Sequence, residues 1–327
     1  MNSTILLDVQ HLTHVFPLTK KIAVKAVDDL SFQIYQGEIF GLVGESGSGK
    51  STVARCVMNI YSPTKGAIYY KGINTCDPSA FRANKKMLQV TRQLIFQDSN
   101  SSLNQRMKVC DIITEPLKIH KIRPLRGSLR AEAEFQMHYV GLDAAFLDKY
   151  PSELSGGQRQ RIAIARALSM EPELLVADEP IASLDVSIQA QIINLLVKLQ
   201  KELGIALVFI SHDLRIVQHI STQVAVMYLG EVVETAPKEE LFNRPTHPYT
   251  KALLSAVPVP RPGVEKNRIV LHGELPSPIN RPKGCSFCTR CSMADESCRL
   301  APPPRMLVGD GHYCRCTKVG GTVNQIV

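Results

Sequence analysis

The stretch GLVGESGSGKST, residues 41–52, constrains the fold of this chain more than any other. Gly44, four further residues and then Gly-Lys-Ser at 49–51 fit the pattern of a phosphate-binding loop. The glycines let backbone N–H groups approach phosphate oxygens, the lysine adds a positive charge, and the serine offers a hydroxyl to Mg²⁺. An apolar run at 38–43 precedes the loop and a helical pattern at 51–58 follows it. The sequence therefore predicts a strand, a loop and a helix that hold the phosphates of a nucleotide.

The size and charge of the chain exclude several classes of protein. A length of 327 residues allows one large domain with an appendage, or two domains. The formal net charge of +8 is typical of a solvated basic face, and the basic cluster at 118–130 lacks the interleaved aromatics of a nucleic-acid surface. No apolar run reaches the roughly 18–20 residues that cross a bilayer, and the N-terminus has no secretory signal. We therefore expect a cytosolic protein, soluble or peripheral to a membrane, without a nucleic-acid partner.

Two apolar runs end in side chains that suit nucleotide chemistry. The run at 174–179 ends in Asp178 and Glu179, which predicts a Mg²⁺-linked aspartate and a water-activating glutamate at a strand end. The run at 206–210 leads to His212. A single histidine is most often structural, but open α/β sheets bind ligands at the ends of parallel strands, which favours a functional role here.

The region between residues 99 and 170 is predicted to be largely helical. A short strand at 94–98 contains Gln97, which alone indicates little. The polar pattern from 99 to 149 indicates an inserted helical subdomain, and LSGGQRQRIAIARAL at 154–168 follows it. Ser155 is typical of a helix N-cap there, so this segment is either an ordinary capped helix or a second helix end that binds phosphate.

The N-terminal part mixes strands with the phosphate loop. We expect an edge strand at 5–12, a second strand at 30–35 and a hairpin at 66–74. Phe16 is our choice for an aromatic ring that stacks on adenine, with His14 second; a packed loop aromatic is the alternative.

The composition changes near residue 258. A Pro-rich, charged segment begins there and predicts a boundary between a domain at 1–257 and an extension at 258–327. Six of the nine cysteines lie between 285 and 316. In a reducing cytosol this clustering indicates a metal site rather than disulfides.

Taken together, these motifs resemble those of the ATP-binding cassette (ABC) ATPases over roughly residues 6–257. The motifs that carry the resemblance are GESGSGKS (Walker A), Gln97 (Q-loop), LSGGQ (signature), LLVADE (Walker B), Ser183-Leu184-Asp185 (D-loop) and His212 (switch histidine). A signature and a switch histidine in this order are close to unique to the family. The implied fold is an α/β P-loop NTPase with a mixed sheet core, an antiparallel β subdomain, a helical subdomain and a small Cys-rich C-terminal extension.

The resemblance implies a head-to-tail pair of cassettes that enclose two ATP molecules and Mg²⁺. It implies that Glu179 is the general base, that His212 contacts the γ-phosphate, and that Gln97 acts beside them. Residues implied to bind ATP are Phe16, Gly44, Glu45, Ser46, Gly47, Ser48, Gly49, Lys50, Ser51, Thr52 and Asp178, and in trans Ser155, Gly156, Gly157 and Gln158. Ser51, Gln97 and Asp178 are the implied magnesium partners, directly or through water.

Within the family the chain is similar to the ATPase subunits of bacterial oligopeptide/dipeptide importers. The similar segments are SSLNQRMKV, ASLDVSIQAQ, FISHDL, RPTHPYTKALLSAVP and GELPSPINRPKGC. FISHDL and GELPSP most resemble the second of the two ATPases of such systems, whereas Ser99 and Gln105 replace a usual proline. The implied partners are two transmembrane permease subunits, a homologous ATPase in a heterodimer rather than a homodimer, and an external substrate-binding protein, which places the chain at the cytoplasmic face of the membrane. The cargo stays open among dipeptides, oligopeptides, nickel complexes and glutathione.

The cysteines allow two ligand sets. Cys285, Cys288 and Cys291 have the spacing of a ferredoxin-type iron–sulfur run. The importer resemblance instead implies the set Cys285, Cys291, Cys298 and Cys316, with Cys316 rather than Cys314 as the last ligand. We favour the second set with a [4Fe–4S] cluster, and Zn²⁺ is the alternative.

Two other classes of function explain the sequence less well. ABC ATPases that act on DNA or ribosomes usually carry long coiled-coil insertions or two cassettes, whereas only 58 positions separate Gln97 from Ser155 here. A metal-storage or redox protein would leave the ATPase motifs unexplained.

Overall fold

The computed structural model describes residues 4–20, 22–257, 268–274, 276–320 and 322–323, and all structural statements concern these residues. The chain divides into two compact units. The first comprises residues 1–6, 34–39 and 73–210, and the second comprises residues 7–33, 40–72 and 211–327.

The first unit contains a parallel sheet with the strand order β8-β7-β6. These strands are β6 (Arg92–Ile95), β7 (Leu174–Asp178) and β8 (Ala206–Ser211). Every residue of β7 and β8 is buried, as expected for the continuous apolar runs of parallel strands. Val176 in the middle of β7 pairs with Leu94 on one side and Val208 on the other, so the carboxyl ends of these strands lie at one edge of the sheet.

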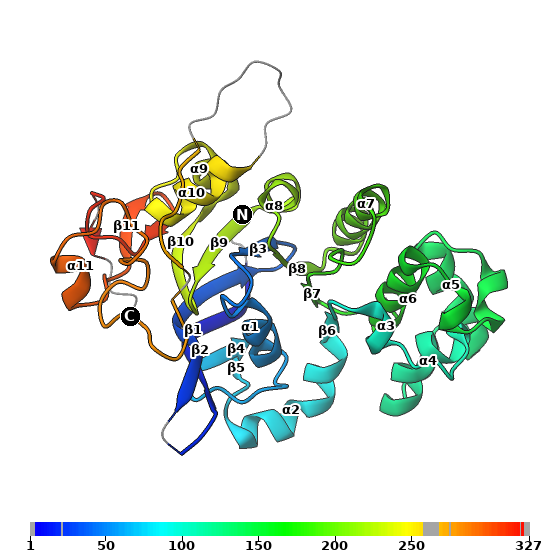
Figure 1. The fold of residues 1–327 in the computed structure, drawn as a ribbon. Coiled ribbons are helices and arrows are strands. Elements are labelled where there is room, and N and C mark those ends of the chain that lie inside the picture. Colours follow the sequence, from blue (N-terminus) through cyan, green and yellow to red (C-terminus); the bar gives the residue numbers. More distant parts are fainter. Residues whose placement is uncertain (1–3, 21, 258–267, 275, 321, 324–327) are drawn as a thin grey trace. The chain divides into compact units, whose positions relative to one another are not determined.

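Helices make up most of the rest of the first unit. They are α2 (Pro78–Thr91), α3 (Ser99–Ser102), α4 (Val109–His120), α5 (Leu129–Tyr139), α6 (Gly156–Leu168) and α7 (Val186–Leu203), with 3-10 turns η1 (Ala144–Asp148) and η2 (Pro151–Glu153). Helices α4, α5 and α6 pack against one another (Figure 1), in the segment where the sequence predicts helices. Helix α7 ends at Gly204, whose φ of 65° suits a residue without Cβ.

The second unit contains a mixed sheet with the strand order β3-β9-β10-β12-β11-β13. Its strands are β3 (Ile39–Val43), β9 (Gln223–Tyr228), β10 (Glu231–Pro237), β11 (Met306–Gly309), β12 (His312–Cys314) and β13 (Thr322–Val323). β3 and β9 are parallel, and the other neighbours are antiparallel. Because β12 pairs with β10 through Glu234↔Cys314 and Thr235↔Tyr313, the C-terminal strands extend this sheet.

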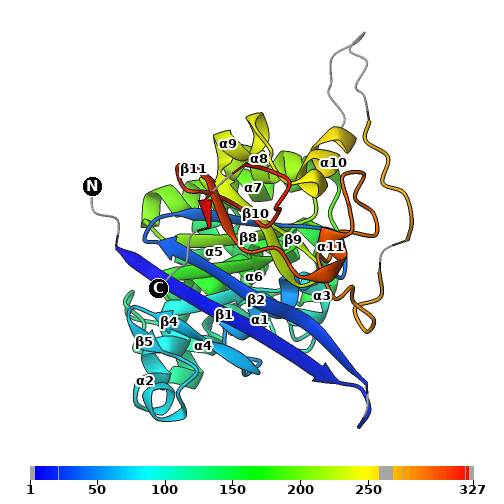
Figure 2. The ribbon, with the colours of Figure 1, turned by 90° about the vertical axis from the view of Figure 1, so that its left-hand side faces the viewer.

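An antiparallel sheet with the order β2-β1-β4 also belongs to the second unit. Figure 2 shows the long strands β1 (Ile5–Pro17) and β2 (Ala23–Tyr35) side by side. The expectation of an edge strand at 5–12 is wrong, because β4 (Lys65–Tyr70) pairs with the other side of β1. β4 and β5 (Ile73–Asn74) are joined by the predicted tight turn.

The helices of the second unit are α1 (Lys50–Val57), α8 (Leu214–Ile220), α9 (Lys238–Asn243), α10 (Pro248–Ala256) and α11 (Ser297–Leu300). Among the described residues of both units, none of the helices has the length and apolar content to cross a bilayer.

Candidate functional site

The phosphate-binding loop lies in the second unit, between β3 and α1. Close backbone approach explains two of its glycines. A Cβ on Gly44 would lie 2.2 Å from the carbonyl oxygen of Met227, and a Cβ on Gly49 would lie 2.2 Å from that of Ala26. Real Cβ atoms do not come this close to backbone, so only glycine fits at either position.

Lys50 begins α1 and is almost fully buried, with 4% of its surface exposed. Its ammonium group donates to the carbonyl oxygens of Gly44 at 2.9 Å and Glu45 at 3.0 Å. A lysine held over the loop, next to the N-terminal N–H groups of a helix, forms a site for anions. The other residues predicted for the phosphates, from Ser46 to Thr52, lie on the same loop and helix.

Three aromatic rings lie together near the end of β1. Phe16 is half-buried and meets His14 edge to face, with ring centroids 4.5 Å apart. His14 is buried and already stacks on Tyr61 at 5.3 Å, with its Nδ1 3.1 Å from the carbonyl oxygen of Ser62. The geometry therefore favours Phe16 over His14 as the ring that can meet a base. Tyr61 belongs to the same cluster but follows α1, so the position of an aromatic ahead of the loop did not predict it.

Gln97, Asp178 and Glu179 lie in the first unit, at the carboxyl ends of β6 and β7. Asp178 is the last residue of β7 and is 4% exposed. Glu179 is half-buried and has a φ of 45°, and its backbone N–H donates to the carbonyl oxygen of Ile210. The amide of Gln97 donates to the Glu179 carboxylate at 3.2 Å. The structure thus brings together the proposed general base and the glutamine whose sequence context alone indicated little.

The predicted signature segment also lies in the first unit, at the start of α6. Ser155 is its N-cap: its hydroxyl accepts from the N–H of Gln158 at 3.3 Å, and its own N–H donates to the Gln158 side chain at 2.9 Å. Gly157 permits close packing, because a Cβ there would lie 2.6 Å from Cγ2 of Ile188. Ser155 remains exposed, so a rigid helix N-terminus is presented to solvent.

His212 follows β8 directly and is exposed. The next residue, Asp213, caps α8 by accepting the N–H of Arg215 at 2.9 Å. This cap fixes the backbone that carries the histidine.

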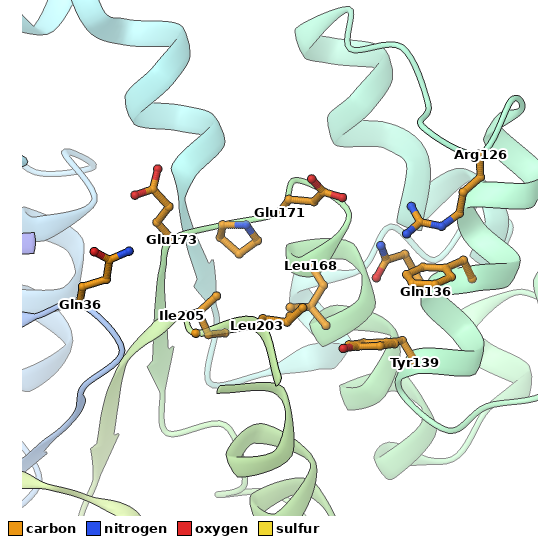
Figure 3. A pocket seen from close by; sticks show the side chains of 12 residues that line it. Gln36, Arg126, Gln136, Tyr139, Leu168, Glu171, Glu173, Leu203 and Ile205 are labelled. Carbon is orange, nitrogen blue, oxygen red and sulfur yellow. The ribbon is translucent and has the colours of Figure 1, made fainter. Parts of the chain in front are cut away.

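A cavity of about 430 Å³ lies in the first unit, away from the residues predicted for catalysis. Figure 3 shows Glu173 and Ile205, which precede β7 and β8, among its lining residues, together with Tyr139 of α5. Asp178 lies at the opposite end of β7, about 15 Å along the strand. The cavity therefore does not form part of the site built by Asp178 and Glu179.

The six C-terminal cysteines lie in the second unit, and electrostatic interactions link several of their thiols. Burial raises the pKa of Cys285 to about 12, and the thiols of Cys288 and Cys298 act in the same direction. Burial also raises the pKa of Cys291, which has Cys316, Cys298 and Cys288 as neighbours. The backbone N–H of Cys285 donates to the carbonyl oxygen of Cys298 at 2.8 Å. This backbone contact places Cys298 next to Cys285, and the thiols of Cys288, Cys291 and Cys316 are near enough to interact electrostatically with members of this pair or with one another.

Among the residues that the structure describes, no three or more His, Cys, Asp or Glu side chains are arranged to hold a metal ion. Cys314 is also deeply buried, with 1% of its surface exposed, and its pKa is raised by burial. Cysteine thiolates are suitable ligands for an iron–sulfur cluster or for zinc, and the arrangement of the described cysteines does not distinguish the two.

Comparisons with known proteins agree with this arrangement. Residues 27–182 match the ABC transporter family, and residues 233–298 match the oligopeptide/dipeptide transporter C-terminal region. A putative oligopeptide transport ATP-binding protein, YkfD of Bacillus subtilis, is 49% identical over 95% of this chain and 94% of the relative. The oligopeptide transport ATP-binding protein OppF of Haemophilus influenzae is 46% identical over 97% of this chain and 98% of the relative.

The fold is also similar to that of a solved ATP-binding cassette. The dimeric post-hydrolysis state of the ATP-binding cassette MJ0796, bound to ADP and Pi, superimposes with a TM-score of 0.63 at 27% identity. It covers 71% of this chain and 99% of the cassette. With the motifs, the relatives and the fold in agreement, the chain belongs to the ABC transporter ATP-binding proteins, as an ABC ATPase with the oligopeptide/dipeptide transporter C-terminal region.

Proposed function

We propose that this chain hydrolyses ATP to power the import of di- and oligopeptides through a membrane ABC transporter, by closing on a partner cassette. One observation carries the proposal: the chain joins a full set of ABC motifs to a match with the oligopeptide/dipeptide transporter C-terminal region at 233–298. Relatives named as oligopeptide or dipeptide transport ATP-binding proteins match over nearly the whole chain.

In this proposal the phosphate loop at 44–52 holds the triphosphate while Phe16 stacks on adenine. Lys50 neutralises the β- and γ-phosphates, and Ser51, Gln97 and Asp178 serve Mg²⁺ directly or through water. The arrangement is supported by the buried ammonium of Lys50 over the loop and by the burial of Asp178 at its strand end.

Glu179 is the proposed general base for the attacking water. The 3.2 Å hydrogen bond from Gln97 orients its carboxylate, and His212 is the proposed contact to the γ-phosphate. Residues 155–158 act in trans on the partner's nucleotide. Because phosphoryl transfer depends mainly on positioning and charge stabilisation, a site divided between two cassettes is switched on by their closure.

The proposed assembly contains two transmembrane permease subunits, a homologous ATPase subunit and an external substrate-binding protein. We propose a heterodimer of ATPases at the cytoplasmic face of the membrane. We also propose a division into an ABC ATPase domain at 1–257, with a helical subdomain at 99–170, and a Cys-rich extension at 258–327. The linker at its start falls on 258–267, outside the described residues.

For the cysteine cluster we propose a [4Fe–4S] group held by four thiolates, with zinc as the alternative. The proposed ligands are Cys285, Cys291, Cys298 and Cys316. Their support is that burial raises the pKa of Cys285 and Cys291, and that Cys298 and Cys316 are among the thiols that act on these two in the same direction. A bound group would clamp a segment that has little apolar core of its own. Anaerobic purification followed by iron, sulfide and zinc analysis decides the matter: a colourless protein with stoichiometric zinc overturns the iron–sulfur assignment.

The transport function is tested by reconstitution. The full chain is expressed with the permease and ATPase subunits that co-purify with it from membranes, and the complex is placed in proteoliposomes with its binding protein. ATP-dependent uptake of labelled di- or oligopeptides is expected, and it should disappear in a Glu179→Gln complex. Failure of every permease to co-purify, or ATP-dependent uptake of nickel or glutathione without peptide uptake, contradicts the peptide assignment.

A further inference from the structure

Arg290 connects the Cys-rich C-terminal segment, residues 276–320, to the phosphate loop. It lies between Cys288 and Cys291, and only 11% of its side chain is exposed. Its guanidinium binds the carboxylate of Glu45, with Nη1 3.0 Å from Oε2 and Nη2 3.4 Å from Oε1. The contact is bidentate and partly buried. In this geometry arginine–carboxylate pairs are strongest.

Packed aromatic rings hold the backbone segment from which the side chain of Arg290 extends. Phe287 is 1% exposed and lies 5.3 Å from the ring of Tyr228 and 5.4 Å from that of Tyr249. The guanidinium of Arg290 lies 5.9 Å from the Tyr228 ring centroid. The arginine therefore extends from a rigid platform rather than from a free surface loop.

A second contact from this platform reaches the same loop residue. The hydroxyl oxygen of Tyr249 accepts the backbone N–H of Glu45 at 3.1 Å. Glu45 is thus held at its side chain by Arg290 and at its backbone by Tyr249. Its carbonyl oxygen, and that of Gly44 before it, both accept a hydrogen bond from the ammonium of Lys50. Any shift of Glu45 therefore moves the acceptors that orient the lysine.

The other arginine contacts from the C-terminal segment reach different places. Arg281 binds Asp28 at 3.0 Å, and Arg315 binds Asp29, both on β2. These pairs attach the segment to the antiparallel sheet. Arg290, in contrast, makes an ion pair from this segment to the phosphate loop.

We propose that Arg290 is a positioning residue for ATP binding. Its contact with Glu45 holds the first turn of the phosphate loop, and with it Lys50, in the arrangement that receives the phosphates. It does not touch the nucleotide. A pre-ordered loop loses less conformational freedom on binding, so the contact contributes to affinity for both ATP and ADP. The proposal makes the Cys-rich segment a part of the nucleotide site.

The test measures binding of Mg-ATP and Mg-ADP to the full chain by isothermal titration calorimetry. Arg290→Gln is expected to raise both dissociation constants about tenfold, which corresponds to about 1.4 kcal/mol. In steady-state turnover KM should rise by a similar factor, with kcat within about twofold of the wild type. Arg290→Lys keeps one charged donor and should recover part of the affinity.

The matched control is Lys318→Gln, which breaks an ion pair with Asp295 inside the same segment. It should leave the dissociation constants within about twofold of wild type. Glu45→Gln removes the charge of the other partner of the ion pair and leaves the C-terminal segment unchanged. It therefore tests whether the ion pair contributes to nucleotide affinity even if Arg290→Gln loosens that segment. The double variant Arg290→Gln/Glu45→Gln should bind no more weakly than either single variant, because both remove one interaction.

The outcomes separate this inference from the nucleotide site on which it rests. Wild-type protein that binds neither nucleotide contradicts the site itself. Wild-type binding with unchanged affinity in Glu45→Gln or in folded Arg290→Gln overturns the role of Arg290 alone. Additive losses in the double variant, or an equal loss in Lys318→Gln, also overturn it.

Discussion

The side-chain amide of Gln97 donates to the carboxylate of Glu179 across 3.2 Å, although the two residues lie 82 positions apart in the chain. The contact follows from the sheet, since β6 and β7 are parallel neighbours and each residue lies shortly beyond the carboxyl end of its strand. A carboxylate held from one side by an amide keeps a defined orientation. This is what a general base requires, because proton transfer is efficient only within hydrogen-bond reach of the attacking water.

Glu179→Gln should retain ATP binding and lose nearly all turnover. The amide keeps the shape of the side chain but cannot accept the proton of the attacking water, and a positioned base contributes roughly 10²–10⁴ in rate. Phosphate release at saturating Mg-ATP measures the loss, and equilibrium ATP binding shows that the site is intact.

Glu173→Gln is the matched control for that variant. Glu173 precedes β7, so it lies at the opposite end of the same strand. Its replacement should leave turnover near the wild-type level. Hydrolysis at wild-type rate by Glu179→Gln would remove Glu179 from the mechanism.

Ser155→Asn should separate two roles of the signature serine. Asparagine caps helices well, so the free energy of unfolding should stay within about 0.5 kcal/mol of wild type. Turnover should nevertheless fall, because the hydroxyl proposed to meet the partner's nucleotide is gone. Urea unfolding and ATPase assays on the same preparations measure the two effects.

Ser128→Ala provides the opposite control. Ser128 caps α5 by accepting the N–H of Ala131 at 3.1 Å. Its loss should cost about 1 kcal/mol of stability and leave turnover unchanged. If Ser155→Asn keeps both stability and full turnover, the in-trans role is wrong.

The sequence predicted those helices and strands whose limits are marked by residues adjacent in the chain. The strands expected from the apolar runs at 174–179 and 206–210 and the capping of α6 by Ser155 are confirmed. Each depends on a few adjacent residues, either an apolar run or a capping side chain. Helix α2 was missed although Asp77 and Pro78 mark its start, because Leu88 is its sole fully buried residue and leaves no strong apolar stripe.

Long-range contacts could not be predicted from the sequence. The position of β1 between two neighbours depends on β4, whose residue Tyr70 pairs with Leu7. The ion pair between Arg290 and Glu45 joins residues 245 positions apart. No periodicity or cap encodes such a pair, since it forms only when separate segments pack together.

Gly49→Ala should be far more damaging than Gly72→Ala. Both glycines have positive φ, 102° and 77°, so both substitutions carry the cost of about 1–2 kcal/mol for a side chain in this conformation. At Gly49 the new Cβ would also lie 2.2 Å from the carbonyl oxygen of Ala26, whereas nothing lies within 4 Å at Gly72. We expect Gly49→Ala to lose more than about 3 kcal/mol of stability together with nucleotide binding. Equal urea midpoints for the two variants would contradict the packing argument.

The stability of the protein should fall in mild acid through His247. Burial lowers the pKa of this side chain from 6.5 to about 4, and its Nδ1 accepts the N–H of Tyr249 at 3.1 Å as the cap of α10. Because the unfolded chain binds the proton more readily than the folded chain, the free energy of unfolding is at its maximum above about pH 6.5 and decreases as the pH falls toward 4.

At pH 5 the loss attributable to His247 should be about 2 kcal/mol relative to pH 7, since one pKa unit corresponds to about 1.4 kcal/mol. Urea unfolding at both pH values measures it. His247→Asn keeps an acceptor at the cap but does not titrate, so its stability should depend less on pH in this range. His219→Gln removes an exposed histidine and should keep the wild-type dependence. If His247→Asn and wild type lose the same stability between pH 7 and pH 5, the buried imidazole does not control the acid response.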